Sequence, residues 1–295
     1  MTKINLNGKE IEFDRIVGYG CSFMAAAECL DHLINTDYSD LQKVNELKRK
    51  FKYDGSAIYN YLSSKKYCDA GKVDEKYIWE PGTVNYPFLF EEQKTKSWLQ
   101  KLSDRFNVPC VNNAWSGGSL QSMQYFHEVD VLDGKIKETD LIVVGLTSIV
   151  RWFYLDNSGN PMHPLFGYKS HQWGENGLYE TFALNFSDNH AFLVHNALTA
   201  IRYFANIKNP VIFVPSFTDL QKIQEWHPTP EGTTISRLFQ DTINRINLLS
   251  CSFNDVHNFD YSDEEAMKGF AGMHPTIQHH EKFADVVYQE LTNNG

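Results

Sequence analysis

The chain has 295 residues, of which 42% are hydrophobic and 22% charged, a balance typical of a globular protein with a sizeable core. Its formal charge of −10 disfavours general nucleic-acid binding, because that function needs positive surface to neutralise phosphates. No apolar run approaches the roughly 20 residues that span a bilayer, and residues 1–13 lack the apolar core of a secretory signal. We therefore expect a cytoplasmic protein with neither nucleic-acid nor membrane partners.

The five cysteines are widely spaced and include no C-x-x-C pair. This pattern argues against a disulfide framework and against a cysteine zinc cluster, and it favours reduced thiols in the core. The neighbouring His279 and His280 cannot share a helix face, so a histidine metal site is disfavoured as well. We expect neither a metal nor another cofactor.

Short strand patterns recur along the chain. Ile4–Phe13 is typical of a β-hairpin, because Asn7-Gly8 forms a two-residue turn signal between alternating apolar residues. Arg15–Gly20 follows as a short apolar strand that ends in glycines. Three later runs, rich in β-branched residues, have the pattern of buried parallel strands: Val108–Asn112, Leu141–Leu146 and Val211–Pro215.

Segments with apolar residues at helical spacing lie between and after these strands. The helices predicted in this way are Lys96–Phe106, Ala191–Ile207, Thr234–Leu249 and about Gln278–Leu291. Strands that alternate with helices predict an α/β layer fold with a mainly parallel sheet.

Two aromatic-rich segments, about 31–92 and 152–189, break this alternation, and the first contains one predicted helix, Asp40–Lys52. Loops of this length in a compact domain are usually lids or binding loops. We therefore expect a single domain over residues 1–295 with two insertions. The aromatic side chains of the second insertion, which begin at Trp152, form either a sugar-stacking wall or a small core of the insertion.

Polar and glycine residues follow three of the predicted strands. Ser22 comes just after the first strand of the sheet, at the edge where open α/β sheets bind ligands, and is either a nucleophile or a helix N-cap. Gly117 and Gly118 follow the next strand, where a glycine lets backbone N–H groups approach a ligand. Thr147 and Ser148 end the third strand, and their hydroxyls either donate to an oxyanion or cap a helix.

His274 lies beside a proline just before the last predicted helix. A histidine on such a loop is well placed to act as a general base, although a lone histidine is more often structural. The order along the chain is therefore serine, glycine, polar residue, histidine, with each group near a strand end or a helix start.

In this order the chain resembles the SGNH/GDSL hydrolase superfamily. The G-C-S-F form at residues 20–23 and the H-P-T-x-x-H-H ending at residues 274–280 are similar to small members of that superfamily encoded by phages. The resemblance covers Asp14–Phe23, Ser97–Met123, Asp140–Arg151, Asn209–Ser216 and Gly272–Leu291. It implies a three-layer α/β/α sandwich with a mainly parallel, flavodoxin-like sheet.

The resemblance also implies roles for individual residues. Ser22 matches the nucleophile, whose own N–H is one oxyanion donor, while Gly117 matches the second donor and His274 the catalytic base. Two positions depart from the family pattern: Thr147 stands where the oxyanion asparagine is expected, and Ala271 stands where the triad acid is expected. The groups left to orient His274 are a backbone carbonyl or a nearby acid, namely Asp260, Asp263 or Glu264.

Cys21 is a rival nucleophile because thiolates are intrinsically stronger, but the family register favours Ser22. The residues expected to bind substrate are Asn113, Ser148, Arg151 and Trp152. We expect a serine hydrolase that cleaves acyl, including acetyl, esters of a small molecule or glycan. The missing asparagine and acid motivate an alternative, a non-catalytic glycan-binding or virion-associated protein of viral origin, and a further alternative is an acyltransferase.

Overall fold

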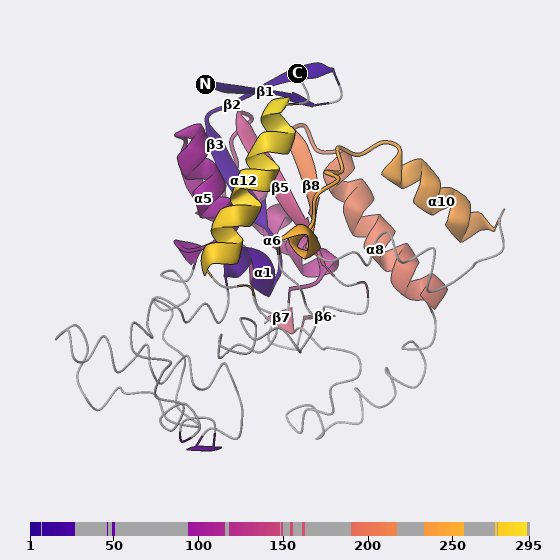
Figure 1. Ribbon diagram of the computed structural model, residues 1–295. Coiled ribbons are helices and arrows are strands. Elements are labelled where there is room, and N and C mark those ends of the chain that lie inside the picture. The colour runs from indigo at the N-terminus through magenta and orange to yellow at the C-terminus, as the bar shows by residue number, and fades with distance from the viewer. Residues whose placement is uncertain are drawn as a thin grey trace.

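The computed structural model describes residues 1–6, 8–26, 46, 49–50, 94–115, 118–147, 149, 154–155, 161–162, 190–216, 233–256, 275 and 277–293. The centre of this part of the chain is a four-stranded parallel sheet (Figure 1). Its strands, in their order across the sheet, are β4 (Cys110–Asn112), β3 (Arg15–Tyr19), β5 (Asp140–Leu146) and β8 (Val211–Pro215). Leu248 adds a single parallel bridge to Phe213.

The strand order shows how the sheet is wound. From β3 the chain moves outward to β4 on one side, and from β5 it moves outward to β8 on the other. This is the flavodoxin-like order, in which the first strand lies between the second and the third. The parallel, flavodoxin-like sheet predicted from the sequence is therefore confirmed.

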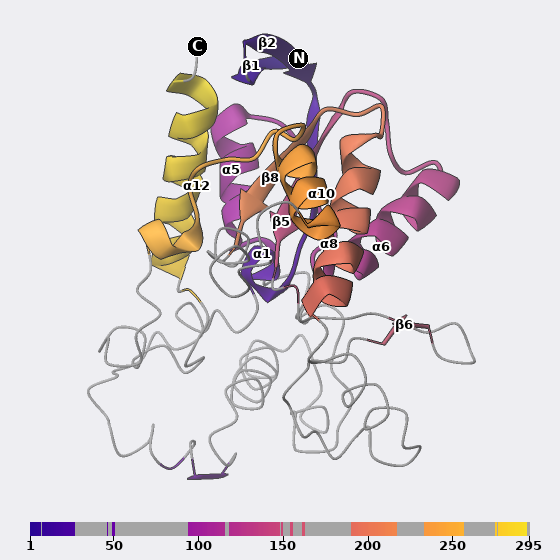
Figure 2. The ribbon, with the colours of Figure 1, turned by 90° about the vertical axis from the view of Figure 1, so that its right-hand side faces the viewer.

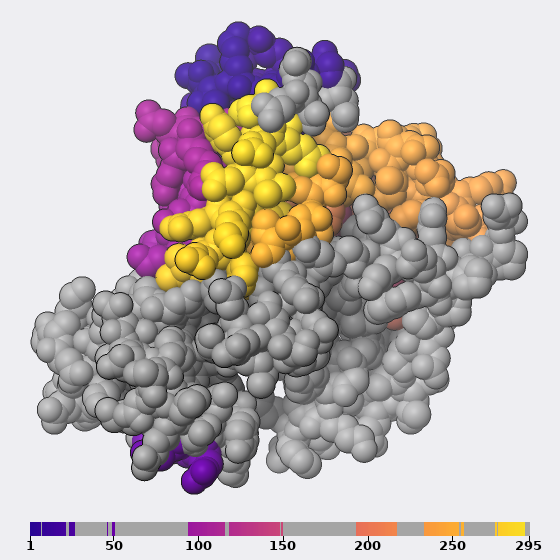
Figure 3. Space-filling model, viewed as in Figure 1, coloured from indigo at the N-terminus to yellow at the C-terminus, as the bar shows by residue number. Residues whose placement is uncertain are grey.

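Helices cover both faces of the sheet, as Figure 2 shows. One face carries α5 (Trp98–Phe106) and α12 (Ile277–Asn293). The other carries α6 (Leu120–Leu132), α8 (His190–Ala205) and α10 (Thr234–Ile243). In the space-filling view, α12 and α5 close over their face of the sheet (Figure 3). These layers are the predicted α/β/α sandwich.

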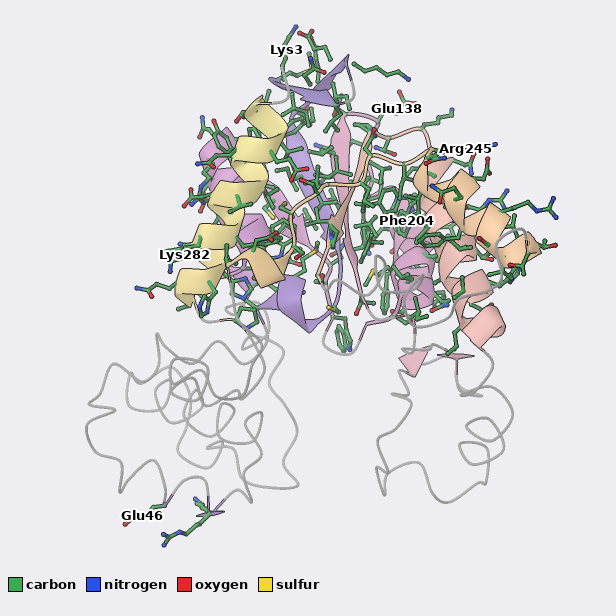
Figure 4. All side chains as sticks on the ribbon, turned by 45° about the vertical axis from the view of Figure 1, so that its right-hand side comes forward. Lys3, Glu46, Glu138, Phe204, Arg245 and Lys282 are labelled. Carbon is green, nitrogen blue, oxygen red and sulfur yellow. The ribbon has the colours of Figure 1, made fainter. Side chains whose placement is uncertain are left out.

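The core lies between the sheet and these helices. Every residue of β5 is buried, which explains why this strand is a continuous apolar run after Asp140. On the α8 side, Phe204 points into this core, whereas Lys3, Glu138, Arg245 and Lys282 lie at the outside (Figure 4). The burial pattern therefore follows the apolar pattern of the sequence.

The predicted hairpin is also confirmed. β1 (Thr2–Leu6) and β2 (Lys9–Phe13) are antiparallel, with Leu6 opposite Lys9, and Gly8 has a φ of 77°, as a two-residue hairpin turn requires. Phe13 anchors the hairpin, with its ring centroid 5.5 Å from that of Phe106. The hairpin therefore packs at the amino end of the sheet, away from the strand ends that carry the candidate site (Figure 1).

Two elements differ from the sequence prediction. Helix α6 is absent from the ranges that the apolar spacing predicts. The predicted helix Thr234–Leu249 ends at Ile243, because the chain after it pairs with β8: the Phe213 N–H donates to the Asn247 carbonyl (2.9 Å), and the Leu249 N–H donates to the Phe213 carbonyl (2.9 Å).

Most of both predicted insertions, and most of the predicted helix Asp40–Lys52, lie outside the described residues. The described part of the second insertion includes the antiparallel pair β6 (Tyr154–Leu155) and β7 (Pro161–Met162). Among the described residues, no helix has the length and apolar character needed to cross a membrane.

Candidate active site at the carboxyl edge of the sheet

The candidate site lies at the carboxyl ends of β3 and β5, which are neighbours in the sheet. The connections that leave these two strands run in opposite directions across the sheet. In open α/β sheets, such a switch point opens a crevice in which ligands bind. The short helix α1 (Ser22–Ala25) and the residues after β4 and β5 meet at this edge (Figure 1).

Helix α1 begins at Ser22, after only two residues that follow β3. The carbonyl of Cys21 starts the helix by accepting hydrogen bonds from the N–H groups of Met24 and Ala25, both at 3.0 Å. Met24 fixes the helix against the sheet: a Cβ placed on Gly20 would lie 2.7 Å from its Cβ, and one placed on Gly145 would lie 2.9 Å from its Cε. Glycine at both positions therefore allows α1 to sit close against β3 and β5.

The loop after β4 packs against the start of α1. The ladder between β3 and β4 continues past the strands, because the Asn113 N–H donates to the Gly18 carbonyl (2.8 Å) and the Trp115 N–H donates to the Gly20 carbonyl (3.0 Å). A Cβ placed on Gly118 would lie 3.0 Å from the Gly20 oxygen. This close approach explains one glycine of the predicted pair, while Gly117 itself lies outside the described residues.

Thr147 follows β5 at the same end of the sheet as Ser22. The sheet pairs Tyr19 with Val144, so Ser22 and Thr147 each stand three residues past a paired position on adjacent strands. Thr147 is 2% exposed, and its hydroxyl is buried without a hydrogen-bond partner among the described residues. A buried hydroxyl in this state destabilises the fold by roughly 1–3 kcal/mol, so the position calls for an explanation.

Asn113, predicted to bind substrate, uses a side-chain donor within the protein. Its amide donates to Asp130 on α6 (2.7 Å), and the Tyr19 hydroxyl donates to the same carboxylate oxygen (2.8 Å). Tyr19 is fully buried, and burial together with this hydrogen bond raises the pKa of its phenol. The network fixes the chain just ahead of the glycine loop.

Asn112 links three elements of the site, and its role was not foreseen from the sequence. Its amide donates to the Met24 carbonyl of α1 (2.9 Å) and to the Ser97 hydroxyl that caps α5 (3.1 Å). Its side-chain oxygen accepts from the Ala114 N–H (3.0 Å). We call this set of contacts the Asn112 bracket, because it joins α1, the start of α5 and the loop after β4.

Helix α12, which follows the predicted base, begins at the same end of the sheet as α1 (Figure 1). His280 of α12 is fully buried, and its Nδ1 accepts from the Trp98 N–H at the start of α5 (3.2 Å). Its ring also contacts Phe253 of η3 (Phe253–Asp255) edge to face, at 5.3 Å between centroids. His280 is therefore held both by packing and by a hydrogen bond. His274 itself lies outside the described residues.

The described cysteines have the character of core thiols. Cys21 is fully buried, which disfavours it as a rival nucleophile. Burial raises the pKa of Cys110 to about 12 and also raises the pKa of Cys251, so both thiols are uncharged at neutral pH. Among the described residues, no cluster of His, Cys, Asp and Glu could hold a metal ion.

Several predicted site residues lie beyond the described part of the chain, so their roles remain predictions. The side chain of Ser22 also lies outside what the structure describes, although its backbone is described at the start of α1. The residues concerned are Gly117, Ser148, Arg151, Trp152, Ala271 and His274, together with the possible acids Asp260, Asp263 and Glu264.

No family model matches the chain, and no curated protein matches it. The chain is similar to a solved structure from Desulfitobacterium hafniense, described as a lipolytic protein of the G-D-S-L family, with a TM-score of 0.41 and 11% identity over 94% of this chain and 99% of that one. It is also similar to LAE5, an α/β hydrolase from the metagenome of Lake Arreo, with a TM-score of 0.39 and 13% identity over 95% and 96%. A GDSL-like lipase structure from Parabacteroides merdae gives 0.39 and 12% over 99% and 100%.

Proposed function

We propose that this protein is a serine ester hydrolase of the SGNH type, which cleaves acyl esters with Ser22 as its nucleophile. The proposal rests on the motif order in the sequence and on the positions of Ser22 and Thr147, which follow adjacent strands at the switch point of the sheet. The observation that carries it is the buried hydroxyl of Thr147, which has no hydrogen-bond partner within the described part of the chain. A donor held in reserve beside a nucleophile is what an oxyanion site needs, because its bond forms when negative charge develops.

In the proposed mechanism, the Ser22 Oγ attacks the carbonyl carbon of the ester while His274 removes its proton. The resulting oxyanion accepts hydrogen bonds from the N–H groups of Ser22 and Gly117 and from the Thr147 hydroxyl. The intermediate collapses as His274 returns the proton to the departing alcohol, which leaves an acyl-serine. Water then attacks this ester with His274 again acting as base, and the products are the carboxylic acid and free Ser22.

The proposed substrates are neutral acyl esters, including acetylated sugars. Asp and Glu outnumber Lys and Arg, giving the chain a formal charge of −10, which disfavours a polyanionic substrate. We propose that Ser148, Arg151 and Trp152 contact the substrate, together with the polar atoms of Asn113 that do not bond Asp130. The phage-type first motif motivates the further proposal of a viral origin.

The test uses the purified full chain with 4-nitrophenyl acetate and a fluorophosphonate probe. We expect wild-type protein to hydrolyse the ester and to be labelled, and Ser22→Ala to do neither. His274→Ala should lose most of the activity but keep the fold. Equal labelling and hydrolysis by wild type and Ser22→Ala would refute the assignment of the nucleophile.

The same experiment addresses the two alternatives. Product that forms only when an acceptor alcohol is supplied would identify an acyltransferase. Binding to a glycan array without turnover, unchanged in His274→Ala, would identify a non-catalytic binding protein.

A further inference from the structure

Trp115 is an exposed aromatic residue at the carboxyl edge of the sheet. The residue is 49% exposed, whereas Trp98, the other tryptophan among the described residues, is 1% exposed. The other large apolar side chains that are exposed in the described part of the chain are Met1, Val131 and Leu132. Met1 precedes the hairpin and the other two end α6, so these three lie away from the candidate site.

The register of the sheet places Trp115 beside the proposed nucleophile. Strands β3 and β4 pair Gly18 with Asn112, so Trp115 stands opposite Cys21, one residue before Ser22. The N–H of Trp115 donates to the Gly20 carbonyl (3.0 Å), and its own carbonyl accepts from the Gly118 N–H (2.9 Å). The backbone of Trp115 is therefore held at both its N–H and its carbonyl, next to the start of α1.

We propose that the Trp115 indole is a binding subsite for a ring-bearing part of the ester substrate, an inference that rests on the proposed function. An indole presents a large, rigid apolar face, and flat rings stack on such a face. Because the Trp115 backbone is held next to the start of α1, we infer that a ring stacked on its indole would lie near the scissile ester. Aryl rings and the apolar faces of sugar rings share this chemistry, so both classes of ester are candidate ligands.

The kinetic test compares Trp115→Ala and Trp115→Phe with wild type. The ring-bearing substrates are 4-nitrophenyl acetate, ethyl benzoate and methyl 6-O-acetyl-glucopyranoside, and the ringless substrate is ethyl acetate. Trp115→Ala should raise KM about 3- to 10-fold for at least one ring-bearing ester, with kcat and the KM of ethyl acetate unchanged. Trp115→Phe should restore much of the loss. The substrate whose KM rises shows whether the bound ring is an aryl ring or a sugar. It also shows whether that ring lies on the acyl side or on the alcohol side of the ester.

Leu132→Ala is the matched control, because it truncates an apolar residue that is 86% exposed at the far end of α6. It should change no KM value. The proposal is overturned if Trp115→Ala leaves the KM of all the ring-bearing esters unchanged, or if it alters ethyl acetate by the same factor.

A binding measurement separates failure of this inference from failure of the proposed function. Ser22→Ala protein is titrated calorimetrically with 4-nitroacetanilide, an amide analogue of the aryl ester, with and without Trp115→Ala. Weaker binding in the Trp115→Ala background supports the subsite even if wild type hydrolyses nothing. Hydrolysis by wild type, together with identical binding in both backgrounds and an unchanged KM for the acetylated sugar in Trp115→Ala, retains the nucleophile and overturns the subsite.

Discussion

Removal of the Thr147 hydroxyl should change stability and activity in opposite directions. Thr147→Val has nearly the same volume and removes a buried hydroxyl that has no partner among the described residues. We expect the free energy of unfolding to rise by about 1 kcal/mol, because the penalty of burying that group disappears. We also expect kcat for 4-nitrophenyl acetate to fall by about 10²–10³, the usual effect of losing an oxyanion donor.

Thr147→Ser is the control for this prediction, because it keeps a hydroxyl and removes a methyl group. It should retain most of the activity while losing stability. Denaturant unfolding and steady-state kinetics on the three proteins give both readouts. If Thr147→Val keeps full activity, the hydroxyl is not an oxyanion donor.

His127 predicts how stability depends on pH. The residue is 1% exposed, its Nδ1 lies 2.9 Å from the Tyr203 hydroxyl, and its Nε2 has no partner among the described residues. Burial lowers the pKa of His127, and the nearby Asp130 and Glu128 oppose this shift only in part. The unfolded chain therefore binds a proton below about pH 6.5 that the folded chain resists.

The free energy of unfolding should accordingly fall as the pH drops below about 6.5, by at most about 1.4 kcal/mol per pH unit from this residue. His127→Phe should remove that contribution, because it fills a similar volume without titrating. Urea unfolding of both proteins at pH 8 and pH 5.5 measures the difference. Equal pH dependence in wild type and variant would show that His127 does not resist protonation.

The Asn112 bracket couples separate elements to the geometry of the site. Asn112→Ala removes three hydrogen bonds, to Met24, Ser97 and Ala114. We expect a loss of about 3 kcal/mol in the free energy of unfolding, at about 1 kcal/mol for each bond. We also expect a 10- to 100-fold fall in kcat, because α1 and the loop after β4 lose their fixed spacing.

Asn209→Ala is a matched control for the bracket. The Asn209 amide also donates to two carbonyls, those of Lys137 (2.7 Å) and Asp140 (3.3 Å), but at the amino end of the sheet. This variant should lose stability without losing kcat in the folded protein. An equal kcat for Asn112→Ala and wild type would show that the bracket is structural only.

The sheet could be predicted from the sequence because each of its strands has a local apolar pattern. A strand such as β5 is a continuous apolar run after Asp140, and the carboxyl ends of parallel strands must meet at one edge. Ser22 and Thr147 could therefore be placed together before the fold was known. Both residues follow adjacent strands of the sheet, and this placement does not depend on any side-chain contact.

Helix α6 and the Asn112 bracket could not be predicted in the same way. The buried side of α6 includes Ser122 and His127 beside apolar residues, so its apolar residues form no clear stripe. Ser122 is satisfied by the capping box with Ser119, and the Nδ1 of His127 pairs with the Tyr203 hydroxyl. The bracket joins Asn112 to a carbonyl 88 positions away, a contact that no local pattern encodes.

Across the whole molecule, the sheet separates chemistry from anchoring. The candidate site occupies the carboxyl edge, and a buried ion pair occupies the amino edge. There the Arg15 Nε donates to Asp140 (2.8 Å) and its Nη2 also donates to the Lys135 carbonyl (2.7 Å). Asp140 is fully buried and accepts from the Lys137 N–H as well (2.7 Å).

Because of this separation, Arg15→Met should lower stability and leave catalysis intact. Removing the guanidinium leaves the buried Asp140 carboxylate without its partner cation, so the free energy of unfolding should fall by about 3–5 kcal/mol. Below the unfolding transition, kcat and KM for 4-nitrophenyl acetate should match wild type. Chemical denaturation and kinetics on the same preparation test both statements, and a changed kcat in folded Arg15→Met would contradict the separation of the two edges.

The double variant Arg15→Met/Asp140→Leu tests whether the buried, unpaired charge of Asp140 causes the loss of stability in Arg15→Met. Apolar residues of similar volume can replace a buried pair with little loss, because both desolvation penalties disappear together. The Asp140→Leu change should therefore recover much of the stability that Arg15→Met loses, although the Lys137 N–H gives up its acceptor. A double variant less stable than Arg15→Met would show instead that Asp140 holds the start of β5 mainly through the backbone.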